Sequence, residues 1–421
     1  MWWEAYVFAN WVGRSAKKHQ LSTSELSELG AYATLPQAEL ESALDMVERI
    51  NVKQGLITAD LPAERRLFLE QGSIQIQTHT GYVLALEAGT PQARYPVPTK
   101  PEIASLYASE AASFITVPKS VDPVPVMIAE QTPRRPTLTP EESETLEQLR
   151  AHFRREQCEL PSLPDLALKI GKAIDNPDNG NDDIARLIQL DPALTARIIS
   201  VVNSAAFGGV NKIKSIQQAT ARLGRRKVRS LVYSCLLKSI FKINSTALRK
   251  HMEALWQHSA YVAALSFVLG RATPGIDPEQ ALLAGLIHDI GSVAVIGGVN
   301  RFPLLAEREE VLAYTIASSR IEMGMLTLKQ WGLQDELQDV VNNAENWHRM
   351  GSAIPENTDV VILAQLHAQI GSPHQSELPR IDTVPAFFKL AHGELTPRHS
   401  LSVLDQAEED VREVHALISA G

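Results

Sequence analysis

The stretch GLIHDIG at positions 285–291 places a histidine and an aspartate, His288 and Asp289, inside an otherwise apolar run. An imidazole and a carboxylate in such a setting must be hydrogen-bonded, ion-paired or bound to a metal, because unpaired polar groups are costly to bury. The pair is therefore a candidate for half of a metal site that hydrolyses phosphate esters, or for the remnant of one.

A second histidine is expected to lie close to this pair. His258 falls within LWQHSAYVAALSFVL (255–269), where apolar residues recur at steps of three and four, and this spacing predicts a helix with His258 facing the core. Two histidines and a carboxylate from facing helices can bind a divalent ion and lower the pKa of a bound water. The residues alone leave three alternatives: a buried hydrogen-bonded pair, a bound but non-catalytic metal, and a hydrolytic centre.

The sharpest basic cluster is RLGRRKVRS at 222–230, which contains Arg222, Arg225, Arg226, Lys227 and Arg229. Gly224 is expected to separate two helices, so that several cations lie at the start of the second one, where the helix dipole favours anions. Such an arrangement can mark an anion site for nucleic acid, a nucleotide or an acidic partner. The alternative is a solvated face with arginine stems on apolar surface. Aromatic residues are not interleaved with the cluster, so base stacking is not supported.

Composition limits the classes of protein to be considered. A chain of 421 residues is too long for one hydrophobic core, so two or three domains are expected. A net charge of −9 argues against general nucleic-acid coating, and nucleic acid is not an expected partner. The two cysteines, Cys158 and Cys235, lack CxxC spacing and are expected to be reduced thiols in the cytosol.

The N-terminal run MWWEAYVFANWVG is apolar, but it has no positively charged start and is too short to span a bilayer. Its aromatic residues are expected to dock on the protein itself, so no membrane partner is predicted. The alternative is an amphipathic helix on a membrane surface.

Prolines recur through residues 118–140. They predict a semi-rigid linker between an N-terminal and a larger C-terminal part. Residues 22–50 have helical spacing, and residues 52–117 are typical of short strands with glycine turns. The clearest strands are expected at Leu67–Leu69, Ile74–Ile76, Tyr82–Leu86 and Phe114–Val117.

After the linker the sequence predicts helices nearly throughout, including one continuous helix over 278–296 and a helix capped by Asp191 with Pro192 in its first position. The predicted fold class is therefore α+β and multidomain, with an N-terminal β-roll followed by an all-α domain. The expected boundaries are a helical segment at 1–34, the β-roll at 35–120, the linker at 121–143, the helical domain at 144–400 and a last helix at 401–421.

The segments LFLEQGSIQI and VLALEAGTPQARYP resemble the cyclic-nucleotide-binding β-roll over about residues 35–120. In that family a short helix, a glutamate and an arginine in an R-S/T-A run hold the ligand. Here Glu102-Ile103-Ala104 takes the place of that run, and Tyr95–Pro98 follow Arg94 in place of the short helix. A carboxylate repels a phosphate, so the resemblance implies the fold without cyclic-nucleotide binding.

LWQHS and GLIHDIG together resemble the HD superfamily of metal-dependent phosphohydrolases. LPSLPDLALKI, DDIARLIQLDPALTARIISVVNSAAFG and SIQQATARLG narrow the resemblance to its HDOD branch, which is mostly regulatory, over about residues 155–370. By this resemblance His258, His288 and Asp289 match the first three metal ligands. The later positions depart from the pattern, with Arg320 for a histidine, Ala344-Glu345 for two histidines and Gln365 for the last aspartate.

The resemblance implies a vestigial metal site with no catalytic residue and no cofactor, the alternative being a bound divalent metal. It further implies a cytoplasmic bacterial signalling protein that contacts a response regulator, sensor kinase or cyclase, with the β-roll modulating these contacts or mediating a homodimer. The competing hypotheses are an HD-type phosphohydrolase and a protein that binds nucleic acid or a nucleotide through residues 212–229.

Overall fold

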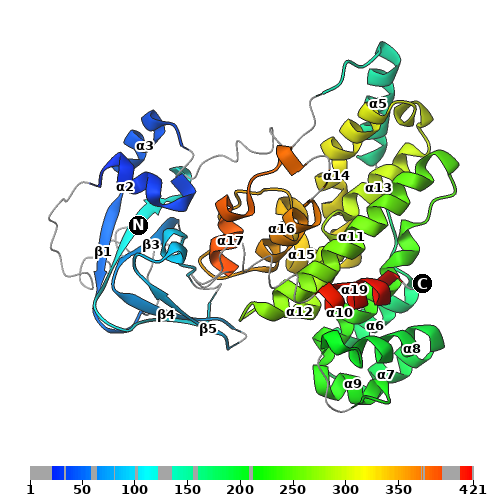
Figure 1. Ribbon diagram of the computed structural model, residues 1–421, viewed down its shortest axis with the longest axis horizontal. Helices are drawn as coiled ribbons and strands as arrows, with labels where there is room; N and C mark the ends of the chain where they lie inside the picture. Colours follow the sequence, from blue (N-terminus) through cyan, green and yellow to red (C-terminus); the bar gives the residue numbers. More distant parts are fainter. Residues whose placement is uncertain are drawn as a thin grey trace.

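The computed structural model places a β-rich domain beside a larger helical domain (Figure 1). It describes residues 21–32, 35–57, 64–79, 81–99, 103–121, 135–154, 160–207, 212–370, 372, 375–390 and 408–419. The predicted order, a β-rich region followed by a helical domain, is confirmed. The aromatic N-terminus and most of the proline-rich linker lie outside the described residues.

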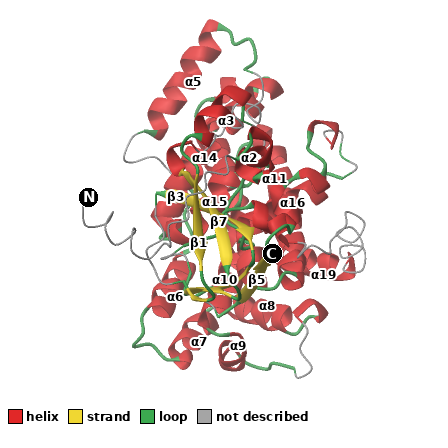
Figure 2. Ribbon diagram, turned by 90° about the vertical axis from the view of Figure 1, so that its left-hand side faces the viewer, coloured by secondary structure: helices red, strands yellow, loops and turns green. Residues whose placement is uncertain are grey.

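The β-rich domain begins with two short helices, α2 (Thr23–Glu28) and α3 (Gln37–Leu44). One antiparallel sheet has the order β1 (Glu48–Val52), β7 (Ala112–Pro118), β3 (Arg65–Gln71). The other has the order β2 (Gly55–Leu56), β6 (Ser105–Ala108), β4 (Ser73–Gln77), β5 (Val83–Glu87). The strands form one block on the side of the molecule that faces the viewer in Figure 2.

The four strands that were clearest in the sequence are confirmed as β3, β4, β5 and β7. Alternate residues of β4 and β5, such as Ile76 and Leu84, are buried, which is the pattern of a sheet with one face on a core. The helical spacing expected up to residue 50 is wrong at its end, because Glu48–Val52 pairs with β7 as strand β1.

The helical domain is built around α11 (Thr246–Ala272), which packs against α12, α13, α16 and α19. Before it come α5 (Pro140–Phe153), α6 (Asp165–Asp175), α7 (Asn181–Gln189), α8 (Pro192–Val202), α9 (Ile216–Leu223) and α10 (Arg225–Leu236). After it come α12 (Pro278–Ile287), α13 (Ile290–Val299), α14 (Glu309–Trp331), α15 (Gln334–Asn343), α16 (Asn357–Ala368), α17 (Pro385–Leu390) and α19 (Glu408–Ser419).

Local signals in this domain are confirmed at several helix ends. The Asp191 side chain accepts backbone hydrogen bonds at the start of α8, with Pro192 in the first helical position. Gly224 adopts φ +85° between α9 and α10, a conformation that favours glycine. Cys235 is a buried free thiol, and burial raises its pKa to about 12.

The continuous helix predicted over 278–296 is wrong, because the chain breaks at His288 and Asp289. Helix α12 ends at Ile287 and α13 begins at Ile290, with Asp289 at φ −116° and ψ 30°. Within the described residues, Pro278–Val299 is the one segment apolar and long enough to cross a membrane, but 89% of its most apolar window is buried inside the domain. The segment is therefore the core of the helical domain.

Two glycines of GLIHDIG allow neighbouring helices to pack closely against the break between α12 and α13. A Cβ on Gly285 would lie 2.8 Å from the Cα of Ala263 in α11. A Cβ on Gly291 would lie 1.7 Å from the backbone oxygen of Arg320 in α14. Because neither position has room for a side chain, α11 and α14 approach the backbone closely on either side of His288 and Asp289.

Candidate functional site

His288 lies at the centre of the helical core and is 1% exposed. Its Nδ1 donates a hydrogen bond of 2.7 Å to the carbonyl oxygen of Gly285, which leaves the lone pair of the neutral ring on Nε2. Within the described residues, Nε2 has no hydrogen-bond partner. The ring of His258 from α11 lies edge-on to it, with centroids 5.2 Å apart. The structure thus brings together the two histidines singled out in the sequence.

Asp289 accepts a 2.5 Å hydrogen bond from the Ser292 hydroxyl, and its carboxylate faces an arginine. The guanidinium Nη1 of Arg320 lies 3.6 Å from Asp289 Oδ1, and its Nη2 forms an ion pair with Glu345. The Arg320 side chain is only 12% exposed. A buried guanidinium therefore lies between two carboxylates, next to the histidine pair.

The electrostatics of this cluster favour charged Arg320 and neutral histidines. Burial lowers the pKa of Arg320, but the carboxylates of Glu345 and Asp289 more than offset this, so its pKa stays above the ordinary value. Burial lowers the pKa of His288 to about 4 and also lowers the pKa of His258. At neutral pH the positive charge of the cluster is therefore that of Arg320.

Gln365 from α16 completes the cluster. Its amide donates to the carbonyl oxygen of Ala344 at 2.5 Å, and its side chain also hydrogen-bonds to His258. The three departures from the HD pattern, Arg320, Glu345 and Gln365, thus all lie beside the histidine pair. The spacing of these residues in the sequence does not predict that they lie together. The only indication was that they differ from the residues of the HD motif.

The cluster does not fit a divalent metal ion. Within the described residues there is no group of three or more His, Cys, Asp and Glu side chains that could hold one. Asp289, the carboxylate next to the histidines, already faces the guanidinium of Arg320, which would repel a cation. Gln365 is neutral and already hydrogen-bonded. What the geometry provides is a buried polar cluster in which Arg320 pairs with both carboxylates and His288 Nε2 alone keeps an unpaired acceptor among the described groups of the cluster.

The basic cluster spans the end of α9 and the start of α10, and cations of α10 contact other parts of the domain. Arg225 donates to the Asn179 carbonyl oxygen, Lys227 pairs with Glu279 at 2.8 Å, and Arg229 pairs with Asp175 at 2.9 Å. These contacts connect α10 to the loop before α7 and to the start of α12. Arg222 and Arg226 are exposed.

The two domains meet at a buried charged junction. Lys389 of α17 and Asp359 of α16 are fully buried and form an ion pair. Arg349 lies 3.2 Å from the same aspartate, and the Lys389 ammonium lies 5.8 Å from the Tyr95 ring of the β-rich domain. The backbone N–H of Ala353 donates to the carbonyl oxygen of Pro96 at 2.9 Å.

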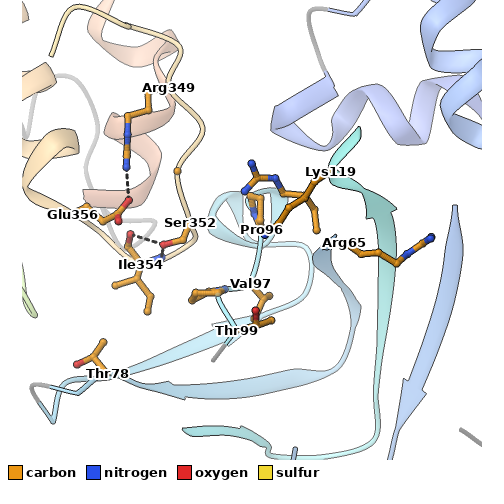
Figure 3. Close-up of a pocket in the computed structure, with 13 residues that line it drawn as sticks. Arg65, Thr78, Pro96, Val97, Thr99, Lys119, Arg349, Ser352, Ile354 and Glu356 are labelled. Atoms are coloured by element: carbon orange, nitrogen blue, oxygen red, sulfur yellow. Dashed lines mark hydrogen bonds and ion pairs between the residues drawn. The ribbon is translucent and has the colours of Figure 1, made fainter. Parts of the chain in front are cut away.

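A pocket of about 300 Å³, open to solvent, lies at this junction and is lined by both domains (Figure 3). Arg349 points to Glu356 across the helical-domain side of the pocket, and the two form an ion pair of 2.7 Å. Arg65 of β3 points away from it and donates to Thr116 at 3.0 Å. These two arginines are therefore engaged in holding the structure around the pocket.

Buried histidines make stability depend on acidity. Burial lowers the pKa of both His288 and His367 to about 4, whereas an unfolded histidine titrates near 6.5. The contribution of these neutral histidines to the free energy of unfolding is complete above about pH 6.5. It is lost as the pH falls toward about 4, because the unfolded chain then binds protons that the folded chain excludes. The loss is about 3 kcal/mol for each histidine.

The check is the free energy of unfolding of wild type, His288→Asn and His367→Gln, measured from pH 7 to pH 4.5. Each variant is expected to show a shallower loss of stability on acidification than wild type. Equal slopes for all three proteins would show that these histidines do not stay neutral in the folded state.

Comparisons with known proteins agree with this architecture. The HDOD domain model matches residues 160–347. An uncharacterized protein of Treponema pallidum is 28% identical over 253 residues, which is 55% of this chain and 46% of that protein. The chain thus spans about half the length of that relative.

Two solved structures are also similar. A candidate metal-dependent phosphohydrolase of Shewanella amazonensis has a TM-score of 0.57 and 22% identity, over 66% of this chain and 100% of that chain. An HDOD domain protein of unknown function from Geobacter sulfurreducens has a TM-score of 0.47 and 22% identity, over 66% and 99% of the two chains. The Shewanella match supports the fold alone. Residues 160–347 thus match the HDOD domain model, on a fold that the Shewanella protein shares.

Proposed function

We propose that this protein is a non-catalytic signalling factor whose HDOD domain works by contacting partner proteins. The observation that carries the proposal is the guanidinium of Arg320, buried between Asp289 and Glu345 beside the two histidines. A metal ion in such a place would activate water. A guanidinium pairs with the same carboxylates, but it has no open coordination position and cannot activate water.

The size of the repulsion between Arg320 and a metal ion also supports the proposal. A divalent ion at 5 Å from a guanidinium is repelled by about 7 kcal/mol at an effective dielectric constant of 20. Recovering that cost would require several anionic or strongly donating ligands. The cluster offers two neutral imidazoles and two carboxylates, Asp289 and Glu345, that are already paired with Arg320.

The β-rich domain is proposed to modulate these contacts without binding a cyclic nucleotide. Its resemblance to the cyclic-nucleotide-binding β-roll places Arg94 next to the ligand, but this side chain is exposed. The following residues, Tyr95 to Val97, are buried. Tyr95 and Pro96 contact the helical domain, so this segment serves domain docking.

The junction offers a physical route between the domains. Residues 346–356 connect Glu345, the partner of Arg320, to the loop that contacts Pro96. A partner that changes how the β-rich domain docks would therefore move residues 346–356, which directly follow Glu345 of the histidine cluster. We expect the partner to be a response regulator, sensor kinase or cyclase in the bacterial cytoplasm, and the β-rich domain could also mediate a homodimer.

The decisive assay is hydrolysis of bis(p-nitrophenyl) phosphate by the full chain with Mn²⁺. The expected result is no turnover above that of His288→Ala/Asp289→Ala, because the site holds an arginine in place of a metal. Mn²⁺-dependent turnover that this double variant abolishes would establish the rival function, a metal-dependent phosphohydrolase.

The contact hypothesis has its own test, crosslinking in the native cells followed by mass spectrometry. Crosslinks between the helical domain and a defined signalling protein, reproduced with the two purified proteins, are the expected result. If purified response regulators, sensor kinases and cyclases of that cell all fail to bind, the proposed partner class is wrong.

A further inference from the structure

A surface pocket of about 430 Å³ lies between α11 and the short 3-10 helix η5 (Leu237–Phe241), outside the histidine cluster. Its inner wall is apolar. The rings of Phe241 and Trp256 meet edge to face with centroids 5.0 Å apart, and Met252 also lines the pocket. These three side chains are at most 6% exposed, so they form a fixed apolar floor beneath the pocket.

The rim of the pocket is positively charged. Lys238, Lys242 and Arg249 line it together with a single carboxylate, Glu253. Lys242 and Arg249 are exposed, and neither forms an ion pair with a carboxylate in the described part of the chain. In a protein with a net charge of −9, such a local excess of cations favours an anionic group at the rim.

An unsatisfied donor in the wall supplies an independent observation. The indole Nε1 of Trp256 is buried and has no hydrogen-bond partner within the described residues. Buried indole N–H groups usually find an acceptor, so we expect the lining side chains to shift and admit one when the pocket is filled. Long flexible side chains such as Gln257 also line the pocket, and rotamer changes of this kind are common at binding surfaces.

We propose that this pocket binds a small amphipathic anion. Its flat apolar body would lie against Phe241 and Trp256, and its carboxylate, sulfonate or phosphate would lie between Lys242 and Arg249. Trp256 and Gln257 directly precede His258 in α11, so such a ligand acts on the helix that carries one residue of the cluster. This small-molecule input is independent of whether the histidine cluster binds metal.

The probe is anilinonaphthalenesulfonate, an aromatic sulfonate whose fluorescence rises in apolar sites, titrated into the full chain. N-phenylnaphthylamine, which has the same rings without the sulfonate, is the neutral control ligand. Lys242→Ala/Arg249→Ala is expected to weaken binding of the sulfonate by about fivefold or more, because two charge-assisted contacts are lost. Binding of the neutral control is expected to stay unchanged.

The matched control variant is Lys250→Ala/Lys329→Ala, which removes two exposed lysines outside the pocket lining and gives the same change in net charge. It should bind the sulfonate as wild type does. If both double variants weaken sulfonate binding equally, or if neither does, the pocket does not recognise the anion and the proposal is wrong.

A second measurement places the probe at the tryptophan. The indole N–H resonance of Trp256, assigned by its absence in Trp256→Phe, is expected to move downfield when the sulfonate saturates the protein, as an acceptor reaches Nε1. A resonance that stays in place at saturation would contradict binding in this pocket.

Discussion

Arg320→Ala is expected to destabilise the protein by about 3–5 kcal/mol, since it leaves two carboxylates facing a core that no longer holds their cation. Asp289 and Glu345 both depend on this guanidinium, which is 12% exposed. The expected effect is large because the cost comes from the stranded carboxylates and not from a lost surface contact. The measurement is the free energy of unfolding from a denaturant titration.

The control for this prediction is Arg380→Ala. Arg380 forms an ion pair of 2.7 Å with Asp382, but its side chain is 80% exposed, so removing it is expected to cost at most about 1 kcal/mol. If the two variants are equally stable, Arg320 is not the charge centre of the buried cluster.

Gly291→Ala is expected to cost more than about 4 kcal/mol or to prevent folding of the helical domain. The added Cβ would meet the backbone oxygen of Arg320 at 1.7 Å and the backbone nitrogen of Gly324 at 2.8 Å. Backbone atoms cannot rotate away as a side chain can, so α13 and α14 would have to separate. Yield of folded protein and the free energy of unfolding report the effect.

Gly297→Ala provides the matched comparison on the same helix. Within the described residues, no atom outside the adjacent backbone of α13 lies within 4 Å of a Cβ at this position, so the substitution is expected to stabilise α13 by about 0.5–1 kcal/mol through helix propensity. A Gly291→Ala protein as stable as Gly297→Ala would show that α13 and α14 do not pack as closely as described.

Periodicity in the sequence predicted most of the helices and the four clearest strands. It also correctly predicted that His258 faces the core. It could not predict the break at His288 and Asp289. Both halves of that segment are buried on every side, so their apolar residues carry no amphipathic signal that marks a boundary. Strand β2 has two residues and is too short for any alternation to be seen.

The site was predictable only in part, because its charges come from distant segments. The sequence identified Arg320 as a departure from the HD pattern, but its pairing with Glu345, 25 positions away in the sequence, is a property of the packed helices. The same holds for the basic cluster, where the carboxylate partner of Lys227 lies 52 positions away. Sequence reasoning identifies candidate charges, and the fold decides which of them are already neutralised.

The helical domain has a polar centre whose charged groups pair with one another inside the core. Neutral histidines, an internal cation and a neutral amide stabilise the core, and the charged junction at Asp359 and Lys389 attaches the β-rich domain to it. Such a centre supports a rigid surface for contacts with other proteins, which is the proposed function.

The most direct test is a crystal structure of the protein grown in Mn²⁺, with anomalous scattering used to locate the metal. The proposed function predicts the Arg320 guanidinium between Asp289 and Glu345, and no anomalous peak near the Nε2 atom of His288. A peak within about 2.0–2.4 Å of that nitrogen and of the Asp289 carboxylate, with Arg320 displaced, would contradict it.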